Sequence, residues 1–222
     1  MTGETTFMRQ ISIFDPDQYY QYEVGIIGCG AIGSFVATTL AKLGLRRFTL
    51  WDKDEVKPHN LPNQFFKREH VGMQKVDALA EMMSTLAPNP EALSITKVMK
   101  KCLWWTKICT PIVFACVDSM KARTDILDRC VKNDVKLLID TRMGGQVFEV
   151  YTVDITNEEQ VAQYRQSLHS DEDAEQTPCT ARSIIFNVLS VSSIAVNQLV
   201  KVFNNVDYKP EITGDLVNMM VK

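Results

Sequence analysis

Apolar residues in this chain gather in short unbroken runs, and the first runs are followed by segments with helical periodicity. The run "YEVGII" ends at glycines, and "AIGSFVATTLAKLG" then predicts a helix whose apolar positions include Phe35, Leu40 and Leu43 and which can stop at Gly44. A second run, "RRFTLWD", leads into a polar loop. Residues 74–90 then predict another helix, closed by prolines.

The same alternation continues beyond this helix. Apolar runs at 111–118 and 135–145 flank a helix predicted over 120–133. This order predicts an α/β fold with a Rossmann-like, doubly wound, mainly parallel sheet. "QVFEVYTV" predicts an antiparallel strand toward the C-terminus, and residues 181–203 predict a long apolar helix. We expect one domain over residues 1–222, with residues 1–22 as an N-terminal arm.

Composition and charge exclude several classes of protein. Hydrophobic residues make up 45% of the chain and charged residues 23%, as in ordinary globular proteins. The net charge of -3 gives no reason to expect a nucleic-acid partner. No apolar run approaches the length of a membrane span, and the first residues do not resemble a signal peptide, so we expect no membrane partner and a cytoplasmic location. The six cysteines form no C-x-x-C pair, so the paired-cysteine zinc signature is absent.

A glycine-rich turn is the first candidate for chemistry. Gly28, Gly30 and Gly33 form G-x-G-x-x-G directly after a predicted strand and at the start of a helix. Such a turn lets phosphate oxygens approach backbone N–H groups at the positive end of the helix. Asp52 ends the next predicted strand, 19 residues after Gly33, where a carboxylate can bind ribose hydroxyls. The motif predicts a nucleotide site but does not separate NAD, FAD and ATP.

An NAD-dependent oxidoreductase is one alternative that this motif leaves open. Such an enzyme needs a hydride-transfer site further along the chain, and the sequence offers no clear one. The three histidines are His59, His70 and His169, and none has a carboxylate partner suggested by its spacing. The alternative is therefore disfavoured.

Five blocks, in order and in register, resemble the ThiF/MoeB/HesA family, the bacterial relatives of ubiquitin-activating enzymes. The blocks are "GCGAIGS", "DKDEV", "NLPNQFF", "VGMQK" and "CVDSMKAR", and the resemblance covers about residues 8–205. It implies an ATP-dependent adenylyltransferase that uses ATP and Mg²⁺. The implied partner is a ubiquitin-like or sulfur-carrier protein or a peptide, whose C-terminal carboxylate is activated.

The resemblance also assigns roles to residues. It implies that Asp52 holds the ribose, that Asp54 braces the loop, that Lys75 reaches the phosphates and that Asp118 holds Mg²⁺. The full implied nucleotide-binding set is Gly28, Gly30, Ala31, Gly33, Asp52, Asp54, Asn60, Asn63, Gln64, Lys75 and Asp118. Arg123, in the last block, is expected to brace its loop. Arg9 lies in "FMRQISIF", which resembles the N-terminal arm of the family, so it is implied to act in the active site of a second subunit of a homodimer.

The sequence departs from the family pattern at one position of the polar loop that follows the second apolar run, which we call the crossing loop. The family has N-L-x-R-Q, whereas Asn63 stands here in place of the arginine and brings no charge. Arg68 or Arg182 could replace it. The alternative is a catalytically weakened pseudo-enzyme that acts as a dimeric nucleotide- and partner-binding module. A tRNA-modifying branch of the family is disfavoured by the acidic balance of charge.

Cys179 is the candidate nucleophile. It lies in "TPCTARSI", between an acidic stretch and the long apolar helix, and its placement resembles the crossover-loop cysteine of family members that form a thioester or persulfide. A helix N-terminus and Arg182 could lower the pKa of its thiol. The alternative is a cysteine without a role, since some adenylating relatives need none at this place.

Overall fold

The computed structural model describes residues 6–99, 107–168 and 184–222 and confirms the predicted α/β fold. In the described residues, eight strands form one mixed sheet in the order β3-β2-β1-β4-β5-β6-β7-β8. The parallel strands are β1 (Glu23–Ile27), β2 (Arg47–Trp51), β3 (Ser94–Val98), β4 (Ile112–Ala115) and β5 (Leu137–Gly144). The antiparallel strands are β6 (Val147–Asp154), β7 (Glu211–Asp215) and β8 (Met220–Val221).

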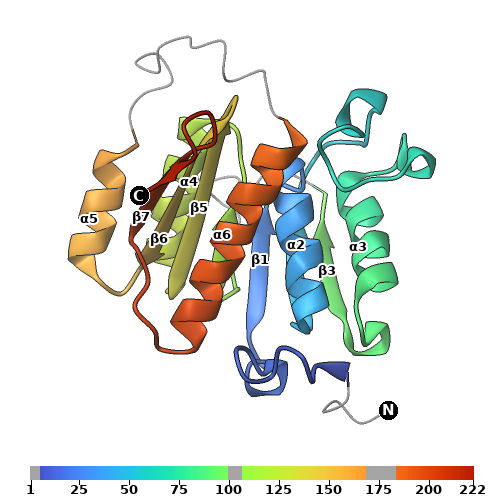
Figure 1. Cartoon of the computed structure of the whole chain (residues 1–222), viewed down its shortest axis with the longest axis horizontal. Coiled ribbons are helices and arrows are strands. Elements are labelled where there is room, and N and C mark those ends of the chain that lie inside the picture. The colour runs from blue at the N-terminus through green and yellow to red at the C-terminus, as the bar shows by residue number, and fades with distance from the viewer. Residues whose placement is uncertain (1–5, 100–106, 169–183) are drawn as a thin grey trace.

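Helices cover both faces of this sheet (Figure 1). The helices α2 (Ala31–Leu43), α3 (Lys75–Leu86) and α6 (Ile185–Phe203) pack on one face, and α4 (Met120–Lys132) and α5 (Glu158–Gln166) on the other. A separate cluster of buried apolar side chains fills each interface between helices and sheet. Burial of these two clusters is the main stabilising contribution to the fold.

The strand order places the candidate site. β1 pairs with β2 on one side and with β4 on the other. Successive strands are therefore added toward one edge of the sheet from β1 to β3 and toward the other edge from β4 onward. In open α/β sheets, ligands bind at such a switch point, outside the carboxyl ends of the strands. The glycine turn follows β1, the crossing loop 52–74 follows β2, and Asp118 follows β4. All three therefore meet at one edge of the sheet.

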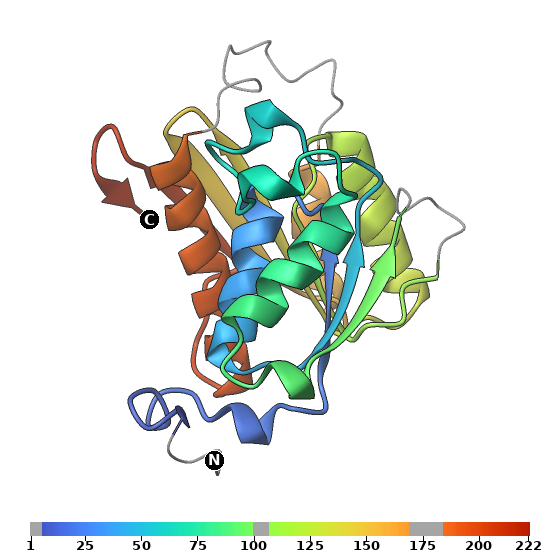
Figure 2. The same ribbon diagram turned by 90° about the vertical axis from the view of Figure 1, so that its right-hand side faces the viewer.

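The N-terminal arm lies at the opposite edge. Gly44 ends α2 with φ +101°, and a Cβ there would lie 2.7 Å from Phe7 and 2.7 Å from Pro16. The Tyr19 ring stacks on Phe203 at the end of α6, with 4.3 Å between ring centroids, and its hydroxyl donates to the Phe203 carbonyl. The arm is thus fixed against the C-terminal ends of α2 and α6, at the end of the molecule away from the glycine turn (Figure 2).

Helix α6 corrects one expectation from the sequence. It has 19 residues and a mean hydropathy of 1.4 in its most apolar window, so its length and composition allow a membrane span. The prediction that no apolar run approaches that length is therefore wrong. Of that window, 44% is buried inside the protein. Val191, Ala195 and Leu199 belong to the core cluster shared with α2 and the sheet. We therefore describe α6 as a core helix.

Candidate functional site

Two glycines of the turn are required by the backbone itself. Gly28 has φ +93°, and a Cβ on it would lie 2.4 Å from the carbonyl oxygen of Cys116. A Cβ on Gly33 would lie 1.8 Å from the carbonyl oxygen of Gly28 and 3.3 Å from the Cβ of Cys116. Helix α2 therefore packs directly on the turn and on the end of β4, and only glycine permits that approach.

Gly33→Ala will lower the free energy of unfolding by about 3 kcal/mol, because the new methyl group overlaps backbone atoms. Intrinsic helix propensity alone predicts the opposite sign, a gain of up to about 1 kcal/mol. Urea denaturation followed by circular dichroism measures the change. Gly30→Ala is the matched control, since its Cβ would meet nothing closer than 3.8 Å. Equal stability of the two variants would contradict the packing described here.

Gly30 differs from the other two glycines because the fold does not require it. It has φ −82°, and the nearest atom to a Cβ built there is the Nε2 of Gln64 at 3.8 Å. As the N-cap of α2 it offers no side chain to the N–H groups of the first turn, which begins at Ala31. Gly30 and Ala31 are therefore half-exposed at a helix N-terminus, with only the Gln64 amide close to Gly30. We call this region the Gly30 space, and its position is suited to an anion.

Asp52 holds the turn to the crossing loop. One carboxylate oxygen accepts a hydrogen bond from the Cys29 backbone N–H at 2.8 Å, and the other accepts from the Asp54 backbone N–H at 2.8 Å. Each oxygen retains a second lone pair for a ligand. The carboxylate is half-buried, at the edge of the sheet beside the glycine turn.

The crossing loop lies above the N-terminal end of α2 (Figure 2). The Phe65 backbone N–H donates to the Ser34 hydroxyl at 3.0 Å, and the Phe65 ring packs edge-on against Phe35. Asn60 is buried, and its Oδ1 accepts from the Lys57 backbone N–H within the loop. Within the part of the chain that the structure describes, the buried Oε1 of Gln64 has no hydrogen-bond partner. The amide nitrogen of the same side chain, Nε2, is the atom of Gln64 that approaches Gly30.

Lys75 begins α3 and joins the site through Asp54. Its backbone N–H donates to the Asp54 carbonyl at 2.9 Å, and its Nζ lies 3.5 Å from the Asp54 Oδ2. Lys53 approaches the other oxygen of the same carboxylate at 3.3 Å. Burial alone would raise the pKa of Asp54, but the two lysines hold it below its usual value. Asp54 is therefore ionised at neutral pH.

Asp118 follows β4 and lies exposed just before α4, which Ser119 caps. Arg123 in α4 fixes the loop of Asp118, because its guanidinium donates a hydrogen bond to the Val117 carbonyl. This contact agrees with the bracing role expected of Arg123. A single exposed carboxylate fits Mg²⁺, which keeps several water ligands and shares phosphate oxygens with its substrate. Asp118 could therefore hold that ion beside a nucleotide.

A buried charged network behind this loop could not be assigned from the sequence. Asp140 is fully buried and pairs with the Nε of Arg123 at 3.0 Å and with the Nε of Arg142 at 2.7 Å. Arg142 stacks on Tyr151 with its guanidinium carbon 4.2 Å from the ring centroid, and it donates to the Ser167 hydroxyl at the end of α5. The only sequence signal is the charged pair inside the apolar run "LLIDTRM".

Two other groups near the site are not suited to chemistry. Burial raises the pKa of Cys29 well above its usual value and that of Cys116 to about 12, so both remain protonated thiols at neutral pH. His70, Glu69 and Glu81 come close enough to suggest a metal site. However, the His70 Nδ1 accepts from the Lys67 backbone N–H, so its Nε2 carries the hydrogen and donates toward Glu81.

The other residues predicted for the site are divided between the arm, the crossing loop and the part of the chain that the structure does not describe. Arg9 is exposed in the N-terminal arm, at the opposite edge of the sheet from the glycine turn. Asn63 lies half-buried in the crossing loop, and Arg68 is exposed in the short helix η3 (Arg68–His70). Cys179 and Arg182, and also His169, lie outside the described residues.

Sequence comparison gives a match across nearly the whole chain. The ThiF family profile matches residues 8–221. Ubiquitin-like modifier-activating enzyme 5 from Oryza sativa subsp. japonica is 29% identical over 138 residues, which cover 55% of this chain and 33% of that enzyme. tRNA threonylcarbamoyladenosine dehydratase from Escherichia coli (strain K12) is 25% identical over 154 residues, 66% of this chain and 58% of the enzyme. The chain spans only about a third of the rice enzyme's length.

Comparison with solved structures gives the same fold. E. coli MccB, crystallised with AMPCPP and MccA, has a TM-score of 0.78 at 14% identity over 100% of this chain and 71% of its own. PaaA has a TM-score of 0.75 at 18% identity over 99% of this chain and 72% of its own. At these identities the likeness establishes the architecture alone.

Proposed function

Since the chain belongs to the ThiF family, we propose that it is an ATP-dependent adenylyltransferase that activates a protein or peptide C-terminal carboxylate. The observation that carries this proposal is the Gly30 space at the N-terminus of α2, where a Cβ on Gly30 would meet only the Gln64 amide nitrogen, at 3.8 Å. Asp52, at the end of β2, binds the glycine turn through the Cys29 N–H, and Lys75, at the start of α3, faces Asp54 of the crossing loop. Asp118 lies at the same edge of the sheet.

Each of these residues has a task in nucleotide binding. The backbone N–H groups at Gly30 and Ala31 would donate hydrogen bonds to the phosphate oxygens, and the free lone pairs of Asp52 would accept hydrogen bonds from the ribose hydroxyls. Lys75 offsets phosphate charge, and Asp54 keeps its ammonium group at the site. When bound at Asp118, Mg²⁺ would supply further charge neutralisation.

Acyl adenylation requires little covalent chemistry from side chains. A carboxylate oxygen bonds to the α-phosphorus while the bond to pyrophosphate breaks, giving an acyl adenylate and free pyrophosphate. The protein contributes by aligning the two reactants and by placing cations where charge develops on the leaving group. The residues at this edge of the sheet are suited to both tasks.

The relatives suggest the class of carboxylate. One named relative activates a ubiquitin-like modifier, and MccB was crystallised with MccA. We propose a ubiquitin-like or sulfur-carrier protein, or a peptide, as the partner of this chain. After adenylation, the Cys179 thiolate would attack the acyl adenylate and form a thioester with release of AMP. In persulfide transfer, the outer sulfur of a Cys179 persulfide, loaded by a separate sulfur donor, would make the same attack and release AMP. We place this reaction in the cytoplasm.

A homodimer would complete the site. Arg9 cannot serve the glycine turn of its own chain, because arm and turn lie at opposite edges of the sheet. A groove of about 530 Å³ runs between the arm, α2 and α6, with apolar lining from Ile13, Phe35, Leu189 and Val196. A second copy seated in this groove would cover the exposed side chains of Ile13 and Leu189 and bring its own arm, with Arg9, toward the first site.

The alternative is a dimeric pseudo-enzyme that binds nucleotide and a partner without efficient chemistry. Asn63 favours it, because the corresponding family position carries an arginine that asparagine cannot replace in charge. The adenylyltransferase and the pseudo-enzyme would both bind nucleotide, but only the adenylyltransferase would turn it over efficiently.

Pyrophosphate exchange tests the proposed reaction. We expect the protein with Mg²⁺ to exchange labelled pyrophosphate into ATP when it is given ubiquitin-like proteins or peptides with a free C-terminal carboxylate. The matched controls are the same substrates with an amidated C-terminus, which cannot attack phosphorus. AMP, and not ADP, is the expected nucleotide product.

Exchange that continues with the amidated substrates, or formation of ADP and phosphate, would contradict adenylation. ATP binding without exchange over a broad set of carboxylates would support the pseudo-enzyme. In either case the fold and the nucleotide site would stand, because they rest on other observations.

A further inference from the structure

Two lysine side chains, one exposed and one buried, approach the carboxylate of Asp54. The Lys53 Nζ lies 3.3 Å from one oxygen, and the Lys75 Nζ lies 3.5 Å from the other. We propose that Lys53 is a second phosphate-binding cation of the nucleotide site, which leaves Asp54 to Lys75 when the triphosphate binds. This inference rests on the proposed ATP site and adds a residue to it.

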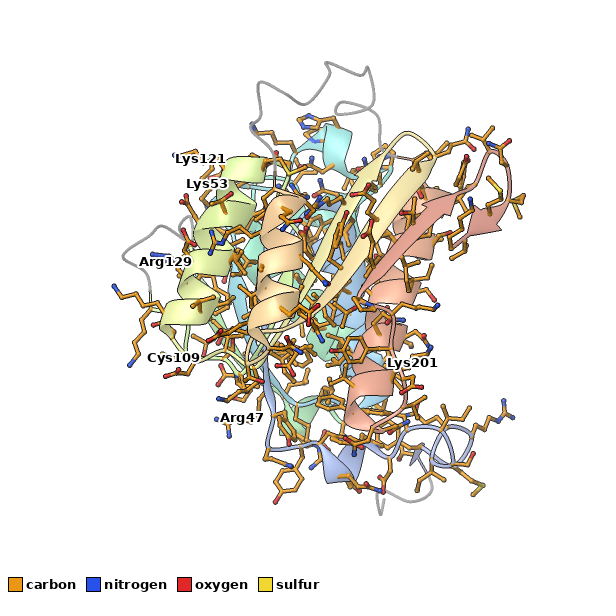
Figure 3. All side chains as sticks on the ribbon, turned by 90° about the vertical axis from the view of Figure 1, so that its left-hand side faces the viewer. Arg47, Lys53, Cys109, Lys121, Arg129 and Lys201 are labelled. Atoms are coloured by element: carbon orange, nitrogen blue, oxygen red, sulfur yellow. The ribbon has the colours of Figure 1, made fainter. Side chains whose placement is uncertain are left out.

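Position is the first argument. Lys53 directly follows Asp52 at the carboxyl end of β2, so it emerges at the edge of the sheet that carries the glycine turn. Figure 3 shows Lys53 at the same end of the molecule as Lys121 in the first turn of α4, whereas Arg47 at the start of β2 lies at the other end. Lys53 and Lys121 are therefore both near the switch point of the sheet.

Exposure is the second argument. The side chain of Lys75 is only 10% exposed, and its backbone N–H is bound to Asp54, so it is held in place. The side chain of Lys53 is 52% exposed. An ammonium group on a flexible four-carbon stem can leave an exposed ion pair at little cost, because water screens such pairs and they add little to stability. Lys53 can therefore move to an anion while Lys75 stays.

Charge is the third argument. Three polar residues of the crossing loop, Asn60, Asn63 and Gln64, are neutral, and Gln64 is the one that approaches Gly30. Two ammonium groups face the Asp54 carboxylate, so Asp54 keeps one cationic partner when the other leaves. Lys67 is paired with Glu69 at 3.1 Å. Lys57 and Arg68 are the competing cations on this loop, and both are exposed.

Calorimetry with adenosine, AMP and ATP–Mg²⁺ separates phosphate contacts from contacts to the nucleoside. We expect Lys53→Gln to weaken ATP binding about tenfold, as for the loss of one charge-assisted hydrogen bond, and to leave adenosine binding unchanged. Lys53→Arg should retain ATP affinity within about threefold, because the charge remains. The matched control is Lys42→Gln, which removes an exposed charge at the far end of α2.

Three results would overturn the assignment. Lys53→Gln could bind ATP as tightly as the wild type does. It could also weaken the binding of adenosine as much as that of ATP, which would mean that the substitution damages the loop. Arg68→Gln could instead show the tenfold loss that is selective for the triphosphate. If the wild type binds no ATP, the proposed function fails together with this inference; if the wild type binds ATP and Lys53→Gln is unaffected, only this inference fails.

Discussion

Asp140→Asn will lower the free energy of unfolding by about 3–5 kcal/mol, the usual effect of removing one partner from a buried ion pair. Asp140 is fully buried and accepts from Arg123 and Arg142, whose side chains are 6% and 9% exposed. The two guanidinium groups stay charged, because arginine does not deprotonate in proteins. Asparagine keeps the shape of the side chain but leaves Arg123 without a carboxylate partner among the described residues and Arg142 with only the more exposed Glu149.

Urea denaturation at pH 7, monitored by circular dichroism, measures this loss. Glu149→Gln is the matched control, because Glu149 also faces Arg142, at 3.5 Å, but is 38% exposed. Its loss should change stability by no more than about 1 kcal/mol. If the two variants were equally stable, the buried ion pairs of Asp140 would not stabilise the fold as described here. We also expect Asp140→Asn to loosen the loop of Asp118, since Arg123 links Asp140 to the Val117 carbonyl.

Gly30→Val will abolish ATP binding, with a loss of at least about 100-fold, while the protein stays folded. The valine side chain fills the space over the first turn of α2, where the backbone must approach phosphate closely. Valine at an N-cap costs about 1 kcal/mol relative to good capping residues, which lowers the melting temperature by about 2–4 °C in a protein of this size.

Calorimetry with ATP–Mg²⁺ and a thermal melt of the same sample provide the two readouts. Gly33→Ala should give the opposite pattern, with a large loss of stability and no side chain added to the ligand space. Wild-type ATP affinity in Gly30→Val would show that the space over α2 is not the phosphate site.

The elements that the sequence predicted correctly are those with long buried runs. The strands β1 and β4 are almost continuous apolar segments, the first six residues of β5 are buried, and α2 has nine buried residues among its thirteen. The strand β3 and the helix α5 were not predicted. β3 is an edge strand with no fully buried residue, and α5 buries only Tyr164. Such elements form because neighbouring elements hold them, which a local pattern does not show.

The same reasoning applies to the site. The glycine turn and Asp52 were predictable because their spacing follows from the backbone of a strand–turn–helix unit. The crossing loop was assigned through a family resemblance, since no periodic pattern specifies how it lies over α2. Asp140 and Arg142 were missed because a charged residue inside an apolar strand does not reveal its partner. Here one partner, Arg123, is 17 residues away on another element.

The most direct test is calorimetry of the wild-type protein with ATP–Mg²⁺ and, separately, with NAD, repeated with Asp52→Ala and Asp118→Ala. The account predicts binding of ATP but not of NAD, and loss of ATP binding in both variants. The two variants remove the carboxylates assigned to the ribose and to Mg²⁺. Binding of NAD in place of ATP, or ATP binding that survives both substitutions, would contradict the adenylation site.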